Sequence, residues 1–176
     1  GGEPFAVHSL VEKVGADVDQ PGQRQHDAAF RYPGNAVGRF NHTDIAQGDF
    51  LALASEVAAA AVEGLDIERA SIWLYEAASG WLKGVASFQR STSRHEIPGY
   101  LPAEQFPNFF AALAARMPLA ADDASDDPRT VELVVRHVVD PELRSFLAVP
   151  ILQGDYLSGV LCIEHTVEPR RWNSDD

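Results

Sequence analysis

The chain has 176 residues, of which 45% are hydrophobic, and its 26 acidic residues outnumber 14 Lys and Arg, giving a formal net charge of −12. This length predicts one domain, with or without an arm, that buries a core without help from disulfides. The negative charge is the wrong sign for a surface that neutralises phosphates, so nucleic acid and anionic lipid are poor partners.

Cys162 is the single cysteine, which excludes an internal disulfide and a two-thiol redox pair and fits a reducing cytoplasm. The sequence has no run of about 18 apolar residues that would span a membrane, and no secretory leader. From the opening Gly1-Gly2 and the helix-start composition of residues 172–176, we expect a module excised from a longer polypeptide.

Residues 1–49 have the composition of an arm or linker, rich in Gly, Asp, Asn and Gln, with one short helix predicted over residues 5–14. The compact domain is predicted to span residues 50–176. Its first helix is expected to begin at Asp49 as the N-cap, because apolar residues then recur every three or four positions up to an end near Gly64.

Two β-hairpins are predicted on either side of a helical segment. The first joins residues 70–76 and 81–90 through a turn, and the second joins residues 145–152 and 156–165. Residues 91–102 contain two prolines and a glycine and are predicted to form a loop.

Two helices are predicted between the hairpins. Aromatic and aliphatic residues at helical spacing indicate one over residues 103–116, and Asp127 followed by Pro128 indicates a capped helix that ends before Pro141. Helices and hairpins in this order favour an α+β fold with an antiparallel sheet over a doubly wound parallel sheet.

Several segments, in their order and spacing, resemble a bacterial GAF sensory domain, over residues 50–176. They are the helix at Phe50, residues 70–75, residues 120–123 ahead of residues 127–130, residues 147–151, and residues 159–165 followed by Arg170 and Trp172. The resemblance implies a six-stranded antiparallel sheet, related to the PAS fold, with terminal helices on one face and a small-molecule pocket on the other. In that family the domain senses, and separate kinase, cyclase or phosphodiesterase domains respond.

The sequence departs from three specialised branches of that family. It has no Asn-Lys pair like that of cyclic-nucleotide-binding members, its cysteine lies in a predicted strand rather than beside a pocket histidine as in bilin-binding members, and it lacks the second thiol needed to reduce methionine sulfoxide. No cofactor is therefore identified from the sequence.

Arg90 and His95 follow the second predicted strand, where the resemblance places the rim of the pocket. An arginine offers a rigid donor fork to an anion, so an anionic small molecule is the favoured ligand. The alternative is that Arg90 pairs with a nearby acid and His95 caps a turn, which is the commoner role of such loop residues. Trp73, Phe88, Phe109 and Phe110 would form an aromatic wall of the pocket, or simply the core.

Asp123, Arg129 and Thr130 are further candidates for ligand binding. Free N–H groups in the first turn after Asp127 could meet an anion, although a helix cap and solvated acids explain the same residues, and the acids lack the spacing of a Ca²⁺ loop. The six histidines form no pair at metal-ligating spacing, so no metal site is predicted.

We therefore expect a non-enzymatic, cytoplasmic sensory module that binds a small molecule and signals through its terminal helices to an output domain, a kinase or a cyclic-di-nucleotide enzyme. The alternatives are a ligandless dimerisation scaffold of the same fold and an enzyme using the acids near Asp123. Leu51, Ala58 and Val62 widen the apolar arc of the first helix and predict a symmetric homodimer through the terminal helices.

Overall fold

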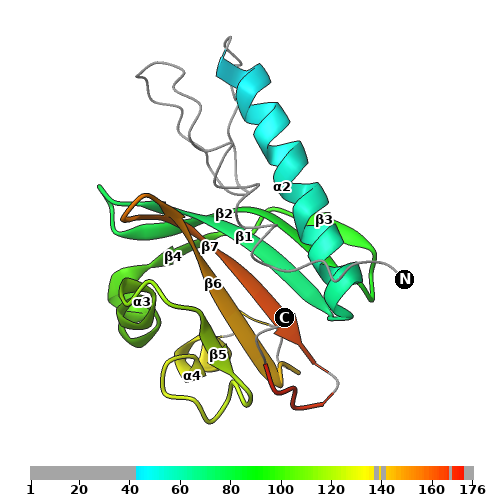
Figure 1. Ribbon diagram of the computed structural model, residues 1–176, viewed down its shortest axis with the longest axis vertical. Coiled ribbons are helices and arrows are strands. Elements are labelled where there is room, and N and C mark those ends of the chain that lie inside the picture. The colour runs from blue at the N-terminus through cyan, green and yellow to red at the C-terminus, as the bar shows by residue number, and fades with distance from the viewer. Residues whose placement is uncertain (1–42, 137–138, 140–141, 167, 173–176) are drawn as a thin grey trace.

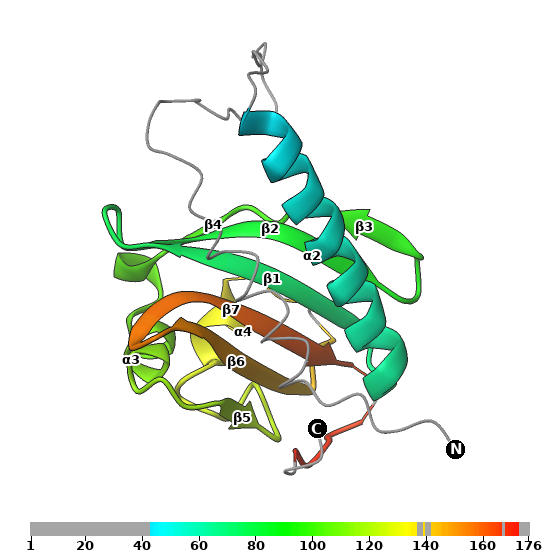
Figure 2. The same ribbon diagram turned by 45° about the horizontal axis from the view of Figure 1, so that its top comes forward.

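The computed structural model describes residues 43–136, 139, 142–166 and 168–172, with side chains from residue 50 onward. An antiparallel sheet forms the middle layer. A long helix, α2 (Thr43–Leu65), crosses one face of this sheet, and the short helices lie on the other side (Figures 1 and 2). The predicted helix over residues 5–14 and the predicted helix start at residues 173–176 lie outside the described residues.

The sheet is antiparallel throughout, and its strands run in the order β3-β2-β1-β7-β6-β5, with β4 pairing β2 beyond this path. After α2 the elements are β1 (Arg69–Glu76), β2 (Trp81–Gln89), β3 (Arg94–Glu96), β4 (Tyr100–Pro102), the 3₁₀-helix η1 (Ala103–Gln105), α3 (Pro107–Ala114), β5 (Leu119–Ala121), α4 (Val131–Val135), β6 (Ser145–Gln153) and β7 (Tyr156–His165). The predicted α+β antiparallel fold is confirmed.

Helix α2 begins earlier than the sequence pattern indicated, at Thr43 rather than at Asp49. Thr43 is itself a residue type that favours the start of a helix, and Gly48 weakens a helix by only about 1 kcal/mol relative to Ala. The helix ends at Leu65, the next residue, Asp66, has a left-handed φ of 53°, and the N–H of Ile67 donates to the carbonyl of Val62 (3.2 Å). This is a Schellman ending in which Asp takes the place usually held by Gly.

The exposed apolar surface of α2, on the side away from the sheet, is smaller than predicted. Ala58 and Val62 are fully buried against the sheet, and only Leu51 of the three predicted extra apolar positions is exposed, at 37%. The prediction of a wide apolar arc on this helix was therefore wrong for two of its three residues, because the sheet itself covers them.

Both predicted hairpins are present. The β1–β2 register pairs Ile72 with Ala86 and Trp73 with Gly84, so Val85 is an extra residue in β2. This β-bulge turns two consecutive side chains, Val85 and Ala86, toward α2.

Three short strands, β3, β4 and β5, were not predicted, and the first two occupy the predicted loop over residues 91–102. Three residues are too few for an alternating pattern, and Pro102 is tolerated because β4 is an edge strand. The helix expected over residues 103–116 is shorter, since a 3₁₀ turn ends at Phe106 before α3 begins.

Helix α4 covers only residues 131–135, whereas a helix was predicted from Pro128 through Val138, and 137–138 lie outside the described residues. The Asp127 carboxylate accepts the N–H of Arg129 (2.8 Å), two residues on, as an N-cap does, but residues 128–130 form a turn ahead of the α-helix. Thr130 then occupies the N-cap position.

The strap, residues 168–172, follows β7 and ties three parts of the domain together. The Arg170 guanidinium donates to the carbonyl of Leu65 at the end of α2 (2.6 Å), and its backbone N–H donates to Ser145 Oγ (2.6 Å). The Trp172 indole N–H donates to the carbonyl of Ala121 in β5 (3.2 Å). No helix within the described ranges is long and apolar enough to cross a membrane.

Candidate functional site

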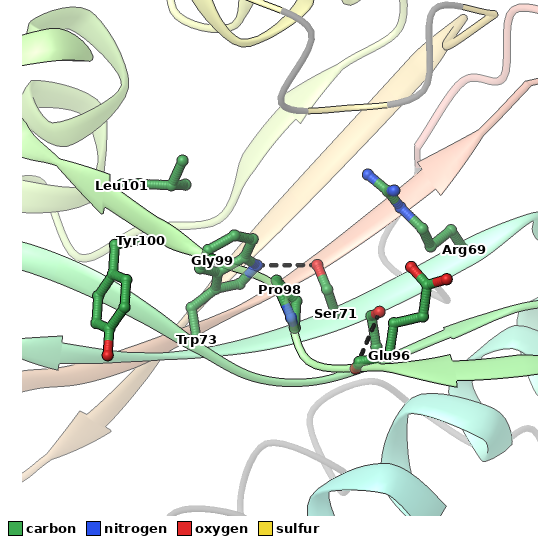
Figure 3. A pocket seen from close by; sticks show the side chains of 9 residues that line it. Arg69, Ser71, Trp73, Glu96, Pro98, Gly99, Tyr100 and Leu101 are labelled. Atoms are coloured by element: carbon green, nitrogen blue, oxygen red, sulfur yellow. Dashed lines mark hydrogen bonds between the residues drawn. The ribbon is translucent and has the colours of Figure 1, made fainter. Parts of the chain in front are cut away.

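A cavity of about 280 Å³ lies on the sheet face opposite α2 (Figure 3). Its walls come from β1, β2, β3, β4 and the segment that joins β3 to β4, and they are formed by Arg69, Ser71, Trp73, Ser87, Glu96, Pro98, Gly99, Tyr100 and Leu101. This volume is at the small end of ligand pockets, which run from roughly 300 to 1,000 Å³. The cavity therefore suits a metabolite-sized molecule.

Strand alternation places these side chains. Ala70 and Ile72 of β1 pack against α2, so Arg69, Ser71 and Trp73 point to the opposite face. The same sheet thus presents apolar residues to the helix and polar residues to the cavity.

A close backbone contact brings the β3–β4 segment over β2. The Gly84 N–H donates to the carbonyl of Gly99 (2.9 Å). A Cβ at residue 84 would lie 2.4 Å from the Cβ of Pro98 and 2.7 Å from its carbonyl oxygen, so a side chain does not fit there. Because Gly84 has none, residues 98–101 can form one wall of the cavity.

An ion pair lies at one end of the cavity. Arg69 donates from Nε (2.9 Å) and Nη2 (2.7 Å) to Oε1 of Glu164 in β7. The Glu164 side chain is only 2% exposed, whereas that of Arg69 is 24% exposed and reaches the cavity. A buried carboxylate of this kind requires its cation, because an unpaired buried charge is strongly destabilising.

Two buried serines contribute hydroxyl groups. Ser71 Oγ accepts the indole N–H of Trp73 (2.9 Å), and Ser87 Oγ donates to the carbonyl of Glu96 (3.3 Å). Ser87 therefore uses its hydrogen within the protein and keeps acceptor lone pairs.

A second, smaller cavity of about 10 Å³ lies next to the first, with room for a single water molecule. Ser71, Trp73 and Leu101 line both cavities. Among the other residues around the smaller one are Phe109, Phe146, Cys162 and Glu164. Burial, and secondarily the charge of Glu164, raises the pKa of the Cys162 thiol well above its usual value, so this thiol stays protonated.

Of the predicted site residues, Trp73 lines the main cavity, and Phe109 lines the smaller one. Phe110 packs on the same face, with its ring centroid 6.4 Å from that of Tyr75. Trp73, Phe109 and Phe110 thus lie on the cavity side of the sheet, whereas the fourth predicted aromatic residue, Phe88, does not. Their contact with a ligand stays a prediction.

Arg90, His95 and Phe88 are not brought to the cavity. Arg90 pairs with Asp66 beside the end of α2, and its hydrogen bond, followed by its charge, lowers the pKa of that exposed carboxyl. Phe88 packs with the α2-side core, and the His95 ring lies 4.7 Å from it, centroid to centroid. Arg90 therefore pairs with a nearby acid, the alternative to a ligand contact, and His95 packs against the Phe88 ring at an angle of 45°.

Asp123, Arg129 and Thr130 hold the loop between β5 and α4. Asp123 Oδ1 accepts the N–H of Ser125 (3.0 Å), and the fully buried Thr130 donates to the carbonyl of Ala124 (2.8 Å). Arg129 donates to the carbonyl of Ala120 (2.9 Å) and to the carboxylate of Asp127, whose pKa it lowers, mainly by this hydrogen bond.

Residues that sequence reasoning missed form most of the cavity: Arg69, Ser71, Ser87, Glu96 and Tyr100, with Glu164 behind Arg69. One signal was available. Arg69 and Ser71 alternate with apolar residues in a strand whose two faces were both expected to be covered, and a polar residue that faces a covered side indicates a site. Within the described part of the chain, no group of three or more His, Cys, Asp or Glu side chains could hold a metal ion.

The sequence matches the GAF domain family over residues 49–176. The chain therefore belongs to the GAF domain family, whose members are regulatory and sensory modules and are generally non-catalytic. The resemblance inferred from sequence is confirmed. Comparison with curated proteins gives no match.

Solved structures with the same fold include proteins of different activities. The blue-light-absorbing form of the PixJ GAF domain of Thermosynechococcus elongatus is 21% identical, with a TM-score of 0.55 over 72% of this chain and 75% of that one. The phycocyanobilin-bound GAF domain of a cyanobacterial phytochrome is 16% identical, with a TM-score of 0.58 over 96% and 84% of the two chains.

A third similar structure is an enzyme. The free methionine-R-sulfoxide reductase of Neisseria meningitidis, in complex with its substrate, is 13% identical, with a TM-score of 0.60 over 99% of this chain and 83% of that one. At these identities the likeness establishes the fold alone, and each ligand or reaction belongs to the protein that carries it.

Proposed function

We propose that this domain is a non-catalytic, small-molecule-sensing module of a multidomain, cytoplasmic bacterial signalling protein, and that its ligand binds in the cavity between β1, β2 and residues 96–101. The cavity itself carries the proposal, because it combines a charged pair, hydroxyl groups and aromatic rings on one sheet face. Buried polar groups lower stability unless they are fully paired, so their concentration at a cavity favours a binding role over packing alone.

A non-catalytic role is supported by the chemistry of the site. The Cys162 thiol is buried and protonated, and the acids near Asp123 are engaged in the β5–α4 loop. A covalent catalyst usually has its nucleophile hydrogen-bonded to a base, whereas the hydroxyl of Ser71 bonds to the Trp73 indole and that of Ser87 to the Glu96 backbone carbonyl.

We propose that the structural change caused by ligand binding is transmitted through α2 and the strap. Arg170 joins the strap to the last carbonyl of α2, and Trp172 joins it to β5, the edge strand from which the chain continues to α4 in the layer that covers the smaller cavity. A ligand that shifts this layer would move the strap relative to α2, and an output domain in the same polypeptide, a kinase or cyclic-di-nucleotide enzyme, would receive that change.

The proposal is tested by native mass spectrometry of freshly purified protein. We expect a small molecule to remain bound to the wild type, to be lost from Ser87→Phe, which fills the cavity, and to remain in Ala78→Phe, which adds the same side chain at an exposed turn. A wild-type protein without any bound molecule would favour the ligandless scaffold, and retention by Ser87→Phe would place the ligand elsewhere.

A symmetric homodimer through the outer face of α2 is part of the same proposal. Leu51 is exposed there, and Ala52 beside it is small enough to let a second helix approach closely. Sedimentation of a form that extends past residue 176 tests it. A dimer at micromolar concentration should become a monomer with Leu51→Glu, and a wild type that is already monomeric would contradict the proposal.

A further inference from the structure

The main cavity has more negative than positive side chains around it, counted over the described residues. Arg69 is engaged by Glu164, which is itself 2% exposed, so these two charges cancel. Glu96 then adds a second carboxylate to the cavity wall. Among the described residues no cationic side chain forms an ion pair with Glu96, and Arg94, two positions earlier on the same face of β3, is exposed and does not pair with it. Counted over the described residues alone, the charged side chains at the cavity, Arg69, Glu96 and Glu164, therefore sum to a negative charge.

An anion would bind poorly in this arrangement. To reach Arg69 it would have to approach two carboxylates, those of Glu164 and Glu96, and any competition for Arg69 would leave Glu164 buried without its cation. The cationic residues on which an anionic ligand was predicted, Arg90 and Arg129, are paired with Asp66 and Asp127 and do not line the cavity.

The two ends of the cavity differ in chemistry. Figure 3 shows the Glu96 carboxylate and the Arg69 side chain at one end, and Tyr100 and Leu101 at the other, with Trp73 between them. Ser87 adds an acceptor at the charged end, because its hydrogen is already donated to the Glu96 carbonyl. A ligand that fits both ends has a cationic donor group and an apolar or aromatic body.

We infer that the cavity takes a small organic amine, with its ammonium group toward Glu96 and Ser87 and its apolar part against Trp73, Tyr100 and Leu101. This inference rests on the proposed function and names the class of its ligand. Aromatic rings suit such a ligand because they attract cations as well as burying apolar surface. The net charge of −12 adds a long-range attraction for cations.

Three probes of nearly the same shape test the charge requirement: 2-phenylethylamine, 2-phenylethanol and 3-phenylpropionate. Each is titrated into the domain while the indole N–H resonance of Trp73, identified by its loss in Trp73→Phe, reports on the cavity. We expect the amine to bind about tenfold or more tightly than the alcohol, since a hydrogen bond to a charged group is worth roughly that factor, and the carboxylate to bind most weakly.

Glu96→Gln should remove the preference for the amine over the alcohol, and Glu63→Gln should retain it. Glu63 is exposed on α2, on the other side of the sheet, and its substitution changes the net charge by the same amount. An unchanged preference in Glu96→Gln, equal binding of the three probes, tighter binding of the carboxylate, or no binding of the amine by the wild type would each overturn the inference.

Failure of this inference can be told apart from failure of the proposed function. If native mass spectrometry detects a retained molecule that Ser87→Phe loses, while the probes show no preference for the amine, the sensing role stands and the ligand class is wrong. If the wild type retains no molecule and none of the three probes shifts the Trp73 resonance, both are wrong.

Discussion

The two faces of the sheet are built from the same strands but have different compositions. On the α2 side the buried cluster is aliphatic, made of Ala, Val, Leu and Ile side chains from α2, β1, β2, β6 and β7. On the other side the cluster is aromatic in part, with Trp73, Phe106, Phe109 and Phe146, and it adjoins the Arg69–Glu164 pair. Packing of apolar side chains stabilises a fold without the free-energy cost of removing polar groups from water.

This difference in composition separates a face that stabilises the fold from the face for which we propose a binding role. The buried cluster on the α2 face is made of apolar side chains, whose burial lowers the free energy of the folded state. The opposite face buries a carboxylate and two hydroxyls, at Glu164, Ser71 and Ser87, that reduce stability unless their partners are present. Four substitutions test this division.

Ile72→Ala is expected to have the largest effect. Ile72 is fully buried in the central strand β1, facing α2. Removing three carbons there should reduce the free energy of unfolding by about 4 kcal/mol, within the range for buried Ile to Ala changes. Urea denaturation followed by circular dichroism measures it. A loss below about 1 kcal/mol would mean that the α2 face is not the main source of stability.

Arg69→Met should cost about 3 kcal/mol, at the lower end of the range for breaking a buried pair, because Arg69 keeps 24% exposure. The double substitution Arg69→Met with Glu164→Leu should recover most of that loss, since it also removes the carboxylate that Arg69 pairs with. A double-mutant cycle by urea denaturation tests this. If the double variant is less stable than Arg69→Met alone, the pair stabilises the fold and the contrast between the faces fails.

Cys162→Ser should change the free energy of unfolding by no more than about 1.5 kcal/mol, as for other replacements of similar volume. Because burial and the charge of Glu164 raise the pKa of the thiol, iodoacetamide should alkylate Cys162 in urea but not in the native state at neutral pH. Mass spectrometry after timed exposure detects the adduct. Rapid alkylation of the native protein would show that the smaller cavity is open to solvent.

Asp127→Asn is expected to have the smallest effect, about 1 kcal/mol at neutral pH, through its loop hydrogen bonds. The Arg129 hydrogen bond lowers the pKa of Asp127 below its ordinary 3.8, so the carboxylate stabilises the fold fully above that ordinary value. This contribution is lost as the pH falls through the lower folded-state pKa. The stability difference between wild type and variant should therefore shrink at acid pH. A constant difference from neutral to acid pH would contradict this assignment.

Sequence patterns predicted the elements that are long enough to show a period. Helix α2 and strands β1, β2, β6 and β7 each repeat apolar residues at the expected spacing. The three-residue strands β3, β4 and β5 have no period to detect, and they form by pairing with β2 and β6. Residues 128–130 form a turn where the valines that follow predicted a longer helix.

The site was predicted less completely than the fold. Trp73 and Phe109 were placed correctly on the cavity face because aromatic residues in a half-buried strand or helix signal a core or a pocket. The pairing of Arg69 with Glu164 joins residues 95 positions apart, and it depends on the β1–β7 register, which pairs these two residues directly. Long-range register of that kind is set by the whole sheet and is not encoded in either local segment.

The absence of a side chain at Gly84 has a consequence for genetics. A screen for mutations that alter signalling should recover substitutions at residue 84, although this residue is not among those that line the cavity. Any larger residue displaces Pro98, and the segment up to Leu101 moves with it. Such mutants would have the same phenotype as mutants of cavity-lining residues. Residue 84 would nevertheless act indirectly, by supporting the position of residues 98–101.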